Sequence, residues 1–242
     1  MLEGLYSAAA GMQAQQQRID SVANDLANVN TNGYKHTRVA FRDLLYVNDA
    51  SGNVRSGAGA AATTIGRGFT QGSMRETGNP LDVAIEGEGF LRVRRADGTD
   101  ALTRDGSLRI DPRGRLTTQR GELVQPAITV PAGTNESAVS IGADGTVSAN
   151  NRPVGRIQLV NVRSPESLDA IGENLYRATA ASGNATNVTA ATTLAQGSVE
   201  ASNIDVADSM TEMMDAQRSF QLASKAVQMQ DQILQIANQV KS

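Results

Sequence analysis

Residues 206–234, VADSMTEMMDAQRSFQLASKAVQMQDQIL, place a large apolar side chain at every seventh position. That series consists of Val206, Met213, Phe220, Val227 and Leu234. A second series begins three residues later and consists of Ser209, Ala216, Ala223, Gln230 and Ala237. Sevenfold spacing keeps one stripe of a helix facing a partner helix. The pattern predicts a long helix from about Asn203 to Lys241, with Ser202 or Asn203 as its N-cap.

The N-terminal region repeats this pattern. Its two series are Leu5, Met12, Ile19 and Leu26, and Ala8, Gln15, Val22 and Val29. They predict a second long helix from about Leu2 to Val29, and Gly33 is the predicted stop, because glycine tolerates the positive φ of many helix ends. The chain therefore carries an apolar seam at each end. We expect these seams to be covered when copies of the chain assemble, because an amphipathic helix needs its apolar face packed.

Composition excludes several classes of protein. The 242 residues contain no cysteine, carry a formal net charge of −3 and are only 3% aromatic. A disulfide framework and a thiolate metal site are therefore impossible, and the charge gives no general attraction to nucleic acid or anionic lipid. No run of about 18 apolar residues occurs, so we expect no membrane insertion. The first residues, MLEGL, do not have the pattern of a cleaved Sec signal peptide.

The middle of the chain has a different period. Leu91, Val93, Leu108 and Ile110 alternate with arginines, as expected for half-buried strands. Turn sequences punctuate this region closely, and we expect hairpins at Asp97-Gly98, Asp105-Gly106, Pro112-Arg113-Gly114 and Asp144-Gly145. This part of the chain is predicted to be an antiparallel β domain.

These patterns divide the chain into four parts. We expect an N-terminal helical arm with its following segment at 1–47 and a Gly/Ala/Thr-rich linker at 48–79. The β domain follows at 80–177, and a return linker with the C-terminal arm occupies 178–242. All six prolines lie between Pro80 and Pro165, which leaves both arms free of the residue that breaks helices. The predicted fold class is α+β, with long N- and C-terminal helices that form a coiled-coil-like core and a central antiparallel β domain.

The densest motif is SVANDLANVNTNGYK at residues 21–35. Asn24 and Asn28 are one helical turn apart, and their amides could tie the helix end to a neighbouring backbone. An ordinary helix C-terminus with polar turn residues explains the same motif about as well. The residues alone leave both interpretations open.

The motif resembles the N-terminal signature of the bacterial flagellar rod and hook proteins. The resemblance continues in LDVAIEGEGF (81–90), TRDGS (103–107), Gln125-Pro126, IGENLY (171–176) and QGSVEASN (196–203). Within the family, the IGENLY and Gln-Pro blocks are most similar to the distal rod proteins, with the proximal rod proteins as the alternative. These blocks follow one another in the family's order along nearly the whole chain.

The resemblance implies a structural subunit of the flagellar basal-body rod, which polymerises into the axial shaft that transmits torque from motor to hook. The implied partners are other copies of the chain, proximal rod and hook subunits, and the envelope ring proteins. Export through the flagellar type III apparatus without a cleaved signal peptide is also implied. The expected assembly interface comprises Leu5, Met12, Ile19, Val22, Asn24, Leu26, Asn28, Val29, Gly33, Val206, Met213, Phe220, Val227 and Leu234.

An enzymatic interpretation finds little support. His36 is the only histidine, and a metal site or a catalytic triad needs further partners. Asp82, Glu86 and Glu88 alternate with small or apolar residues and are expected on the solvent side of a strand. We therefore expect no catalytic residue, cofactor or metal. A surface adhesin with coiled-coil ends and a β-domain enzyme are the rival classes; the first needs an export signal and the second a pocket with perturbed titratable groups.

Arginine is dense between residues 92 and 120. Eight arginines face four acids there, the arginines being Arg92, Arg94, Arg95, Arg104, Arg109, Arg113, Arg115 and Arg120. A single-stranded nucleic-acid site also needs stacking aromatics, and only Phe90 is near. We expect a solvated strand face with ion pairs, and no nucleic-acid partner.

Overall fold

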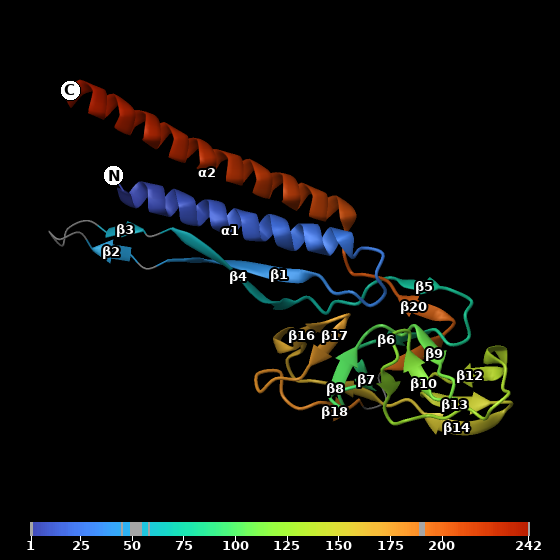
Figure 1. The fold of residues 1–242 in the computed structure, drawn as a ribbon. Coiled ribbons are helices and arrows are strands. Elements are labelled where there is room, and N and C mark those ends of the chain that lie inside the picture. Colours follow the sequence, from blue (N-terminus) through green and yellow to red (C-terminus); the bar gives the residue numbers. More distant parts are fainter. Residues whose placement is uncertain (1, 45, 49–54, 58, 189–191, 242) are drawn as a thin grey trace. The chain divides into compact units, whose positions relative to one another are not determined.

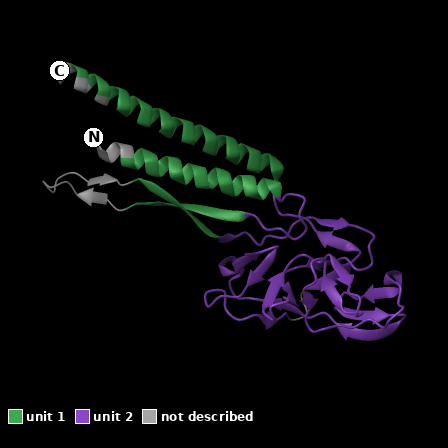
Figure 2. Ribbon diagram, viewed as in Figure 1, with its two compact units in different colours: residues 1–27, 37–65, 205–242 green, residues 28–36, 66–204 purple. Residues whose placement is uncertain are grey.

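The fold is that of a computed structural model, which describes residues 2–44, 46–48, 55–57, 59–188 and 192–241. Within these ranges the side chains of residues 2–5, 46–48, 55–57, 234, 237, 238, 240 and 241 are not described. The chain forms two compact units. Unit 1 contains residues 1–27, 37–65 and 205–242, and unit 2 contains residues 28–36 and 66–204 (Figure 2). This division differs from the predicted one, because residues 28–36 belong with the β domain and not with the first arm.

Two long helices form most of unit 1. Helix α1 spans Leu2–Ala27 and helix α2 spans Val206–Lys241, and the two lie side by side (Figure 1). The lengths of 26 and 36 residues correspond to about 39 Å and 54 Å. Ala216 is fully buried and Ala14 nearly so. Small residues at these positions let the helix backbones approach closely, as the seam of alanines in α2 predicts.

The predicted helix ends need correction. Helix α1 ends at Ala27 and not at Val29, so Gly33 lies six residues beyond the helix and is not its stop. At the start of α2 the cap is Asp205, whose Oδ1 accepts from the N–H groups of Ala207 at 2.8 Å and Asp208 at 3.1 Å. The predicted caps, Ser202 and Asn203, were wrong. The carboxylate of Asp205 suits this position better, because it also compensates the positive end of the helix dipole.

A long hairpin completes unit 1. Strand β1 (Thr37–Asp43) pairs with β4 (Ala60–Arg67). Between them in the sequence, β2 (Tyr46–Asn48) pairs with β3 (Arg55–Gly57). The stretch predicted as a linker thus contains paired strands. Helix α1 also packs on β1, and Gly59 passes so close that an added Cβ would lie 2.9 Å from that of Ala10. The side chain of Asp25 accepts from the N–H of Thr37 at 3.1 Å, which ties the helix end to the start of the hairpin.

Unit 2 is built from antiparallel strands. Its largest sheet runs in the order β16-β17-β8-β7-β11-β10-β9. Strand β15 also pairs with β7 and with β18, which adds β15 and β18 to this sheet. A smaller sheet runs β12-β13-β14, and two further pairs are β6 with β19 and β5 with β20. The bounds are β5 (Met74–Glu76), β6 (Val83–Glu86), β7 (Phe90–Arg94), β8 (Asp100–Thr103), β9 (Leu108–Ile110), β10 (Leu116–Thr118), β11 (Leu123–Val124), β12 (Val139–Ile141), β13 (Thr146–Ala149), β14 (Arg152–Arg156), β15 (Leu159–Asn161), β16 (Asp169–Gly172), β17 (Leu175–Arg177), β18 (Thr186–Asn187), β19 (Thr193–Gln196) and β20 (Ser198–Glu200). Short 3-10 turns occupy Glu136–Ala138 and Pro165–Ser167.

The core of unit 2 follows the predicted alternation. Leu91, Val93 and Leu108 are buried, while Arg94 and Arg109 are exposed. Three of the four predicted hairpins occur, namely β7–β8 at Asp97-Gly98, β9–β10 at Pro112-Arg113-Gly114 and β12–β13 at Asp144-Gly145. The fourth, Asp105-Gly106, was wrong, because it connects β8 and β9, which do not pair with each other. Gly106 is needed there for space, since a Cβ would lie 1.6 Å from the carbonyl oxygen of Val83.

Candidate functional site

The predicted seam residues lie on the helix pair of unit 1. Val22 is buried, and Met12, Ile19, Leu26, Met213, Phe220 and Val227 are all partly buried. Because α2 packs on α1, part of this burial arises within a single chain. The guanidinium of Arg18 and the carboxylate of Glu212 join the helices at 2.9 Å. Leu5 and Leu234 lie outside the described side chains.

The remaining predicted interface residues are placed differently. Val206 is 40% exposed at the first turn of α2, and Asn24 is exposed on α1. Asn28 and Val29 lie beyond the end of α1, where the side-chain oxygen of Asn28 accepts from the hydroxyl of Thr31 at 3.2 Å. Gly33 is buried in unit 2.

A second apolar stripe on α2 is uncovered. Its members are spaced by three and four residues and are exposed, namely Leu222, Ala226, Met229, Ile233 and Ile236. Reasoning from the sequence missed this stripe, although Leu222, Met229 and Ile236 are themselves spaced by seven. This spacing lies beside the stronger sevenfold series that begins at Val206, and only that stronger series predicts the apolar seam. An apolar stripe of this length exposed to water is typical of a surface that a partner covers.

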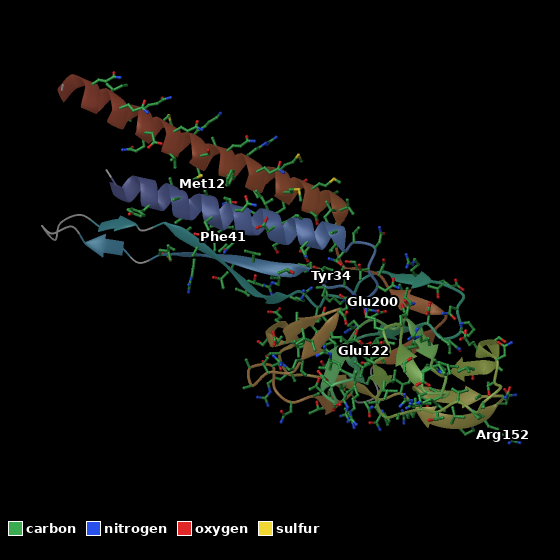
Figure 3. The ribbon with its side chains drawn as sticks, viewed as in Figure 1. Met12, Tyr34, Phe41, Glu122, Arg152 and Glu200 are labelled. Carbon is green, nitrogen blue, oxygen red and sulfur yellow. The ribbon has the colours of Figure 1, made fainter. Side chains whose placement is uncertain are left out.

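The motif at residues 21–35 and the motif at residues 196–203 contact each other in unit 2. The N–H of Gly33 donates to the carbonyl of Glu200 at 2.7 Å, and the N–H of His36 donates to the side-chain oxygen of Asn203 at 2.9 Å. Tyr34 and Glu200 lie close together in Figure 3. The motif at 21–35 and the motif at 196–203 therefore bind each other within one chain.

A buried group of charges lies at the centre of this contact. We call Lys35, Arg104 and Glu200 the Glu200 cluster. The side chains of Lys35 and Glu200 are fully buried and that of Arg104 is 4% exposed. Glu200 accepts from Lys35 Nζ at 2.5 Å and from Arg104 at 3.2 Å, and it also accepts from the N–H of Gly72 at 2.9 Å.

Two cations thus share one carboxylate in a place that water does not reach. Such a group is stable only while its opposite charges compensate one another, because removal of one partner leaves a buried charge without compensation. Burial lowers the pKa of Lys35 below its ordinary value, since desolvation of the ammonium outweighs the attraction of Glu200. The ammonium also donates to the carbonyl of Thr70 at 2.7 Å, so it has two direct oxygen partners.

Aromatic rings form one wall around the cluster. Phe69, Phe90 and Tyr176 meet edge to face, with ring centroids between 5.1 and 6.3 Å apart. The guanidinium of Arg104 lies 5.4 Å from the ring centre of Phe90, and that of Arg67 lies 5.1 Å from Tyr34. Burial raises the pKa of Tyr176 to about 12. These contacts exclude water from the Glu200 cluster and strengthen its electrostatic interactions.

Asp105, next to the cluster, gives a pH-dependent prediction. Burial raises the pKa of its carboxyl above 3.8, although its Oδ1 accepts from the N–H of Ser107 at 3.0 Å. The folded state therefore holds this proton more tightly than the unfolded state, and stability from this group is lost as pH rises from about 3.8 through the folded pKa. We expect Asp105→Asn to remove this dependence, so that the wild type gains stability relative to the variant as pH falls from 7 to 4. Urea unfolding of both proteins at several pH values measures their free energies of unfolding. A difference between the two that does not change with pH would contradict this prediction.

Two predictions about charged side chains were wrong in part. Arg104 is buried and not on a solvated face, because Glu200 compensates its charge. Five of the other arginines do form ion pairs with acids, such as Arg94 with Asp100 at 3.0 Å; the five are Arg92, Arg94, Arg95, Arg115 and Arg120. Asp82 is buried and accepts from Thr77 and Asn79, whereas Glu86 and Glu88 are exposed as predicted.

The described part of the chain offers no metal site or membrane span. None of its side chains form a group of three or more His, Cys, Asp or Glu that could hold a metal ion. No helix within the described ranges is both long and apolar enough to cross a membrane. A groove of about 540 Å³ lies beside Arg156, Leu159, Asn187 and Leu194, open to solvent and away from the Glu200 cluster residues.

Known proteins match the chain at both ends and in the middle. A family model described as flagella basal body rod protein matches residues 5–35. The flagellar hook protein FlgE/F/G D1 domain matches residues 84–149, and the flagellar basal body rod FlgEFG protein C-terminal model matches residues 195–240. Flagellar basal-body rod protein FlgG of Borreliella burgdorferi is 38% identical over 265 residues, which covers 100% of this chain and 99% of that protein.

The chain belongs to the flagellar basal-body rod protein family. Two rod proteins of Caulobacter vibrioides allow a comparison within one organism. Its FlgG is 36% identical to this chain and covers 100% of both proteins. Its FlgF is 32% identical and covers 93% of this chain and 92% of its own length. Lys35, Arg104 and Glu200 each fall in a different one of the three regions that match rod-protein family models.

Proposed function

We propose that this chain is a structural subunit of the bacterial flagellar basal-body rod, of the distal FlgG type. The observation that carries the proposal is full-length similarity to proteins named FlgG, which exceeds similarity to FlgF in identity and coverage. In this role the chain polymerises, contacts proximal rod and hook subunits and the envelope ring proteins, and transmits torque from motor to hook. It lies in the basal body within the cell envelope, and its role there is structural and not catalytic.

The exposed apolar residues of unit 1 support the proposal that the chain polymerises. Helices α1 and α2 pack on each other and present their outer surfaces to a neighbour. The stripe of Leu222, Ala226, Met229, Ile233 and Ile236 remains exposed beside that pair. Covering one exposed leucine or isoleucine contributes about 1.5–3 kcal/mol, so a stripe of this kind can drive assembly once a neighbour supplies the other wall.

Deletion of the gene tests the assignment in the cell. If the chain is the distal rod subunit, basal bodies isolated from the deletion strain should end after the proximal rod and carry no hook. Electron microscopy of these basal bodies gives the readout. Growth that stops before the proximal rod is complete would support the FlgF type, and normal basal bodies would refute a rod function.

A substitution on the exposed stripe tests self-assembly in vitro. Leu222 is 67% exposed, so Leu222→Asp should leave the fold of the free chain unchanged. Because a neighbour would have to bury the new carboxylate, we expect the concentration needed for polymerisation to rise at least tenfold, about 1.4 kcal/mol or more per added subunit. Sedimentation measures the polymer, and circular dichroism checks the helix content.

Gln221→Asp is the matched control for this variant. Gln221 is the preceding residue of the same helix and is also exposed, but it lies outside the apolar stripe. The control adds the same charge and should polymerise close to the wild-type concentration. Equal loss of polymer in both variants would mean that charge alone, and not the stripe, controls assembly.

A further inference from the structure

The chain passes between unit 1 and unit 2 four times, where the ribbon changes colour in Figure 2. We call these passages the four links, and they lie at residues 27/28, 36/37, 65/66 and 204/205. A polypeptide link on its own turns about two soft dihedral angles per residue, so units joined by such links move relative to each other by default. A subunit that transmits torque needs links that resist this rotation.

The side chain of Asn203 ties three of the four links together inside unit 2. Its Oδ1 accepts from the N–H of His36 at 2.9 Å. Its Nδ2 donates to the carbonyl of Gly68 at 2.7 Å, and to the carbonyl and the hydroxyl of Thr70 at 3.2 and 2.9 Å. A primary amide carries donors on one end and an acceptor on the other, and here both ends are used. His36, Gly68 and Asn203 each lie within three residues of a link.

Backbone bonds support the same three segments. The N–H of Gly68 donates to the carbonyl of His36 at 3.0 Å, and the N–H of Asn203 donates to the carbonyl of Tyr34 at 3.4 Å. The guanidinium of Arg67 donates to the carbonyl of Lys35 at 2.8 Å. Each of these bonds joins two segments, whereas the Asn203 side chain bonds to both of the other segments at once. A twist of one segment therefore strains the bonds to the others.

The remaining link is tied on the side of unit 1. The carboxylate of Asp25 accepts from the N–H of Thr37 at 3.1 Å, and both residues belong to unit 1. Asp25 comes shortly before the link at 27/28, and Thr37 directly follows the link at 36/37. Since His36 and Thr37 are neighbours in the chain, the bonds of Asp25 and Asn203 together connect all four links.

We propose that Asn203 is a positioning residue that makes the links turn as one body, so that rotation of unit 1 is passed on to unit 2. Without its amide each link turns separately, because a few connecting residues can absorb large changes in φ and ψ. The inference rests on the proposed function and names a side chain through which torque passes along the subunit.

Spin labels on the two units measure this restraint in the full chain. The chain contains no cysteine, so Gln13→Cys on α1 and Arg152→Cys on β14 supply the two label sites, both exposed. The labelled chain is diluted with unlabelled chain, and pulsed electron paramagnetic resonance gives the distribution of distances between the labels within one chain. Asn203→Ala should widen this distribution about twofold or more at half height. Asn203 is partly exposed, so water can reach the groups that the variant leaves unpaired and the chain should stay folded.

Asn135→Ala is the matched control. It makes the same substitution at an exposed asparagine of unit 2, whose side chain caps the turn Glu136–Ala138 away from the links. This control should keep the wild-type width. Thr70→Val is a second test, because it removes only the hydroxyl acceptor of Asn203 at an exposed position. It should give a width between those of the wild type and Asn203→Ala.

Each outcome decides the proposal. If Asn203 only stabilised unit 2, Asn203→Ala would unfold at lower urea but keep the wild-type width in buffer, and this result would overturn the inference. A wild-type distribution as broad as that of the variant would overturn it as well, because the links would then be unrestrained. If Asn203→Ala does not fold, Thr70→Val decides: a wider distribution supports the restraint and an unchanged one refutes it. None of these results bears on the rod function, which the gene deletion tests separately.

Discussion

Glu200→Gln is expected to destabilise unit 2 by about 3–5 kcal/mol, because it leaves Lys35 and Arg104 buried without a compensating charge. The substitution keeps the shape of the side chain, so the effect isolates the charge. Tyr34 precedes Lys35 in the chain, Tyr176 packs on Phe90, which the Arg104 guanidinium contacts, and the chain has no tryptophan. Two of the four tyrosines therefore report on this region when urea unfolding is followed by tyrosine fluorescence.

Two further variants separate the charge effect from general damage. Glu76→Gln changes an exposed glutamate on β5, the strand that pairs with β20, and should alter stability by no more than about 0.5 kcal/mol. Adding Lys35→Met to Glu200→Gln removes one of the two uncompensated cations and should recover part of the lost stability. If the double variant is no more stable than Glu200→Gln alone, the cluster is not held by charge.

The pH dependence of the Glu200→Gln variant gives an independent check. Burial already lowers the pKa of Lys35, and Glu200 is the group that opposes this shift. Without that carboxylate the pKa should fall further. The folded state then releases the proton of Lys35 at a lower pH than the unfolded state does, so the variant should regain stability as pH rises toward 10.5. A deficit that stays constant up to pH 10 would contradict this account.

The helices could be predicted from sequence because their spacing is local. Every seventh residue from Leu5 to Leu26 and from Val206 to Leu234 is apolar, and a helix is the structure that gathers them on one side. The spacing does not say which helix is the partner. The predicted fold class has the two terminal helices form one coiled-coil-like core, and α1 and α2 do pack on each other in one chain. That neighbouring copies cover what is left of the seams stays a prediction, and Leu26 and Phe220 are only partly buried. The weaker stripe beside the seam, around Leu222 and Ile233, is exposed.

The Glu200 cluster could not be predicted from local pattern. Lys35 and Glu200 are 165 residues apart in the chain, and lysine and glutamate are almost always exposed. Nothing in the spacing of charges distinguishes these two from the others. The resemblance to rod proteins marked both motifs, at 21–35 and 196–203, but gave no reason for them to meet. Folding of the β domain between them supplies that reason, because it brings β20 beside the segment that follows α1.

Gly33→Ala adds a single methyl group to the motif at 21–35, and we expect this variant to be strongly destabilised. Gly33 has a φ of +67°, and a Cβ there would lie 2.6 Å from the backbone of Arg104 and Asp105. Alanine costs about 1–2 kcal/mol for the left-handed backbone, and the clash adds about 1–3 kcal/mol. The same shift would disturb the bond from its N–H to the carbonyl of Glu200. We expect a total loss of about 2–5 kcal/mol in urea unfolding followed by tyrosine fluorescence.

Gly78→Ala is the control that separates space from conformation. Gly78 has a nearly identical φ of +70°, but an added Cβ meets no atom within 4 Å. It should therefore cost only the conformational part, about 1–2 kcal/mol. The difference between the two variants measures how tightly the segment after α1 is inserted against the β domain. Equal losses would mean that the segment is loosely held, and the Glu200 cluster would then lack the rigid support that its buried charges require.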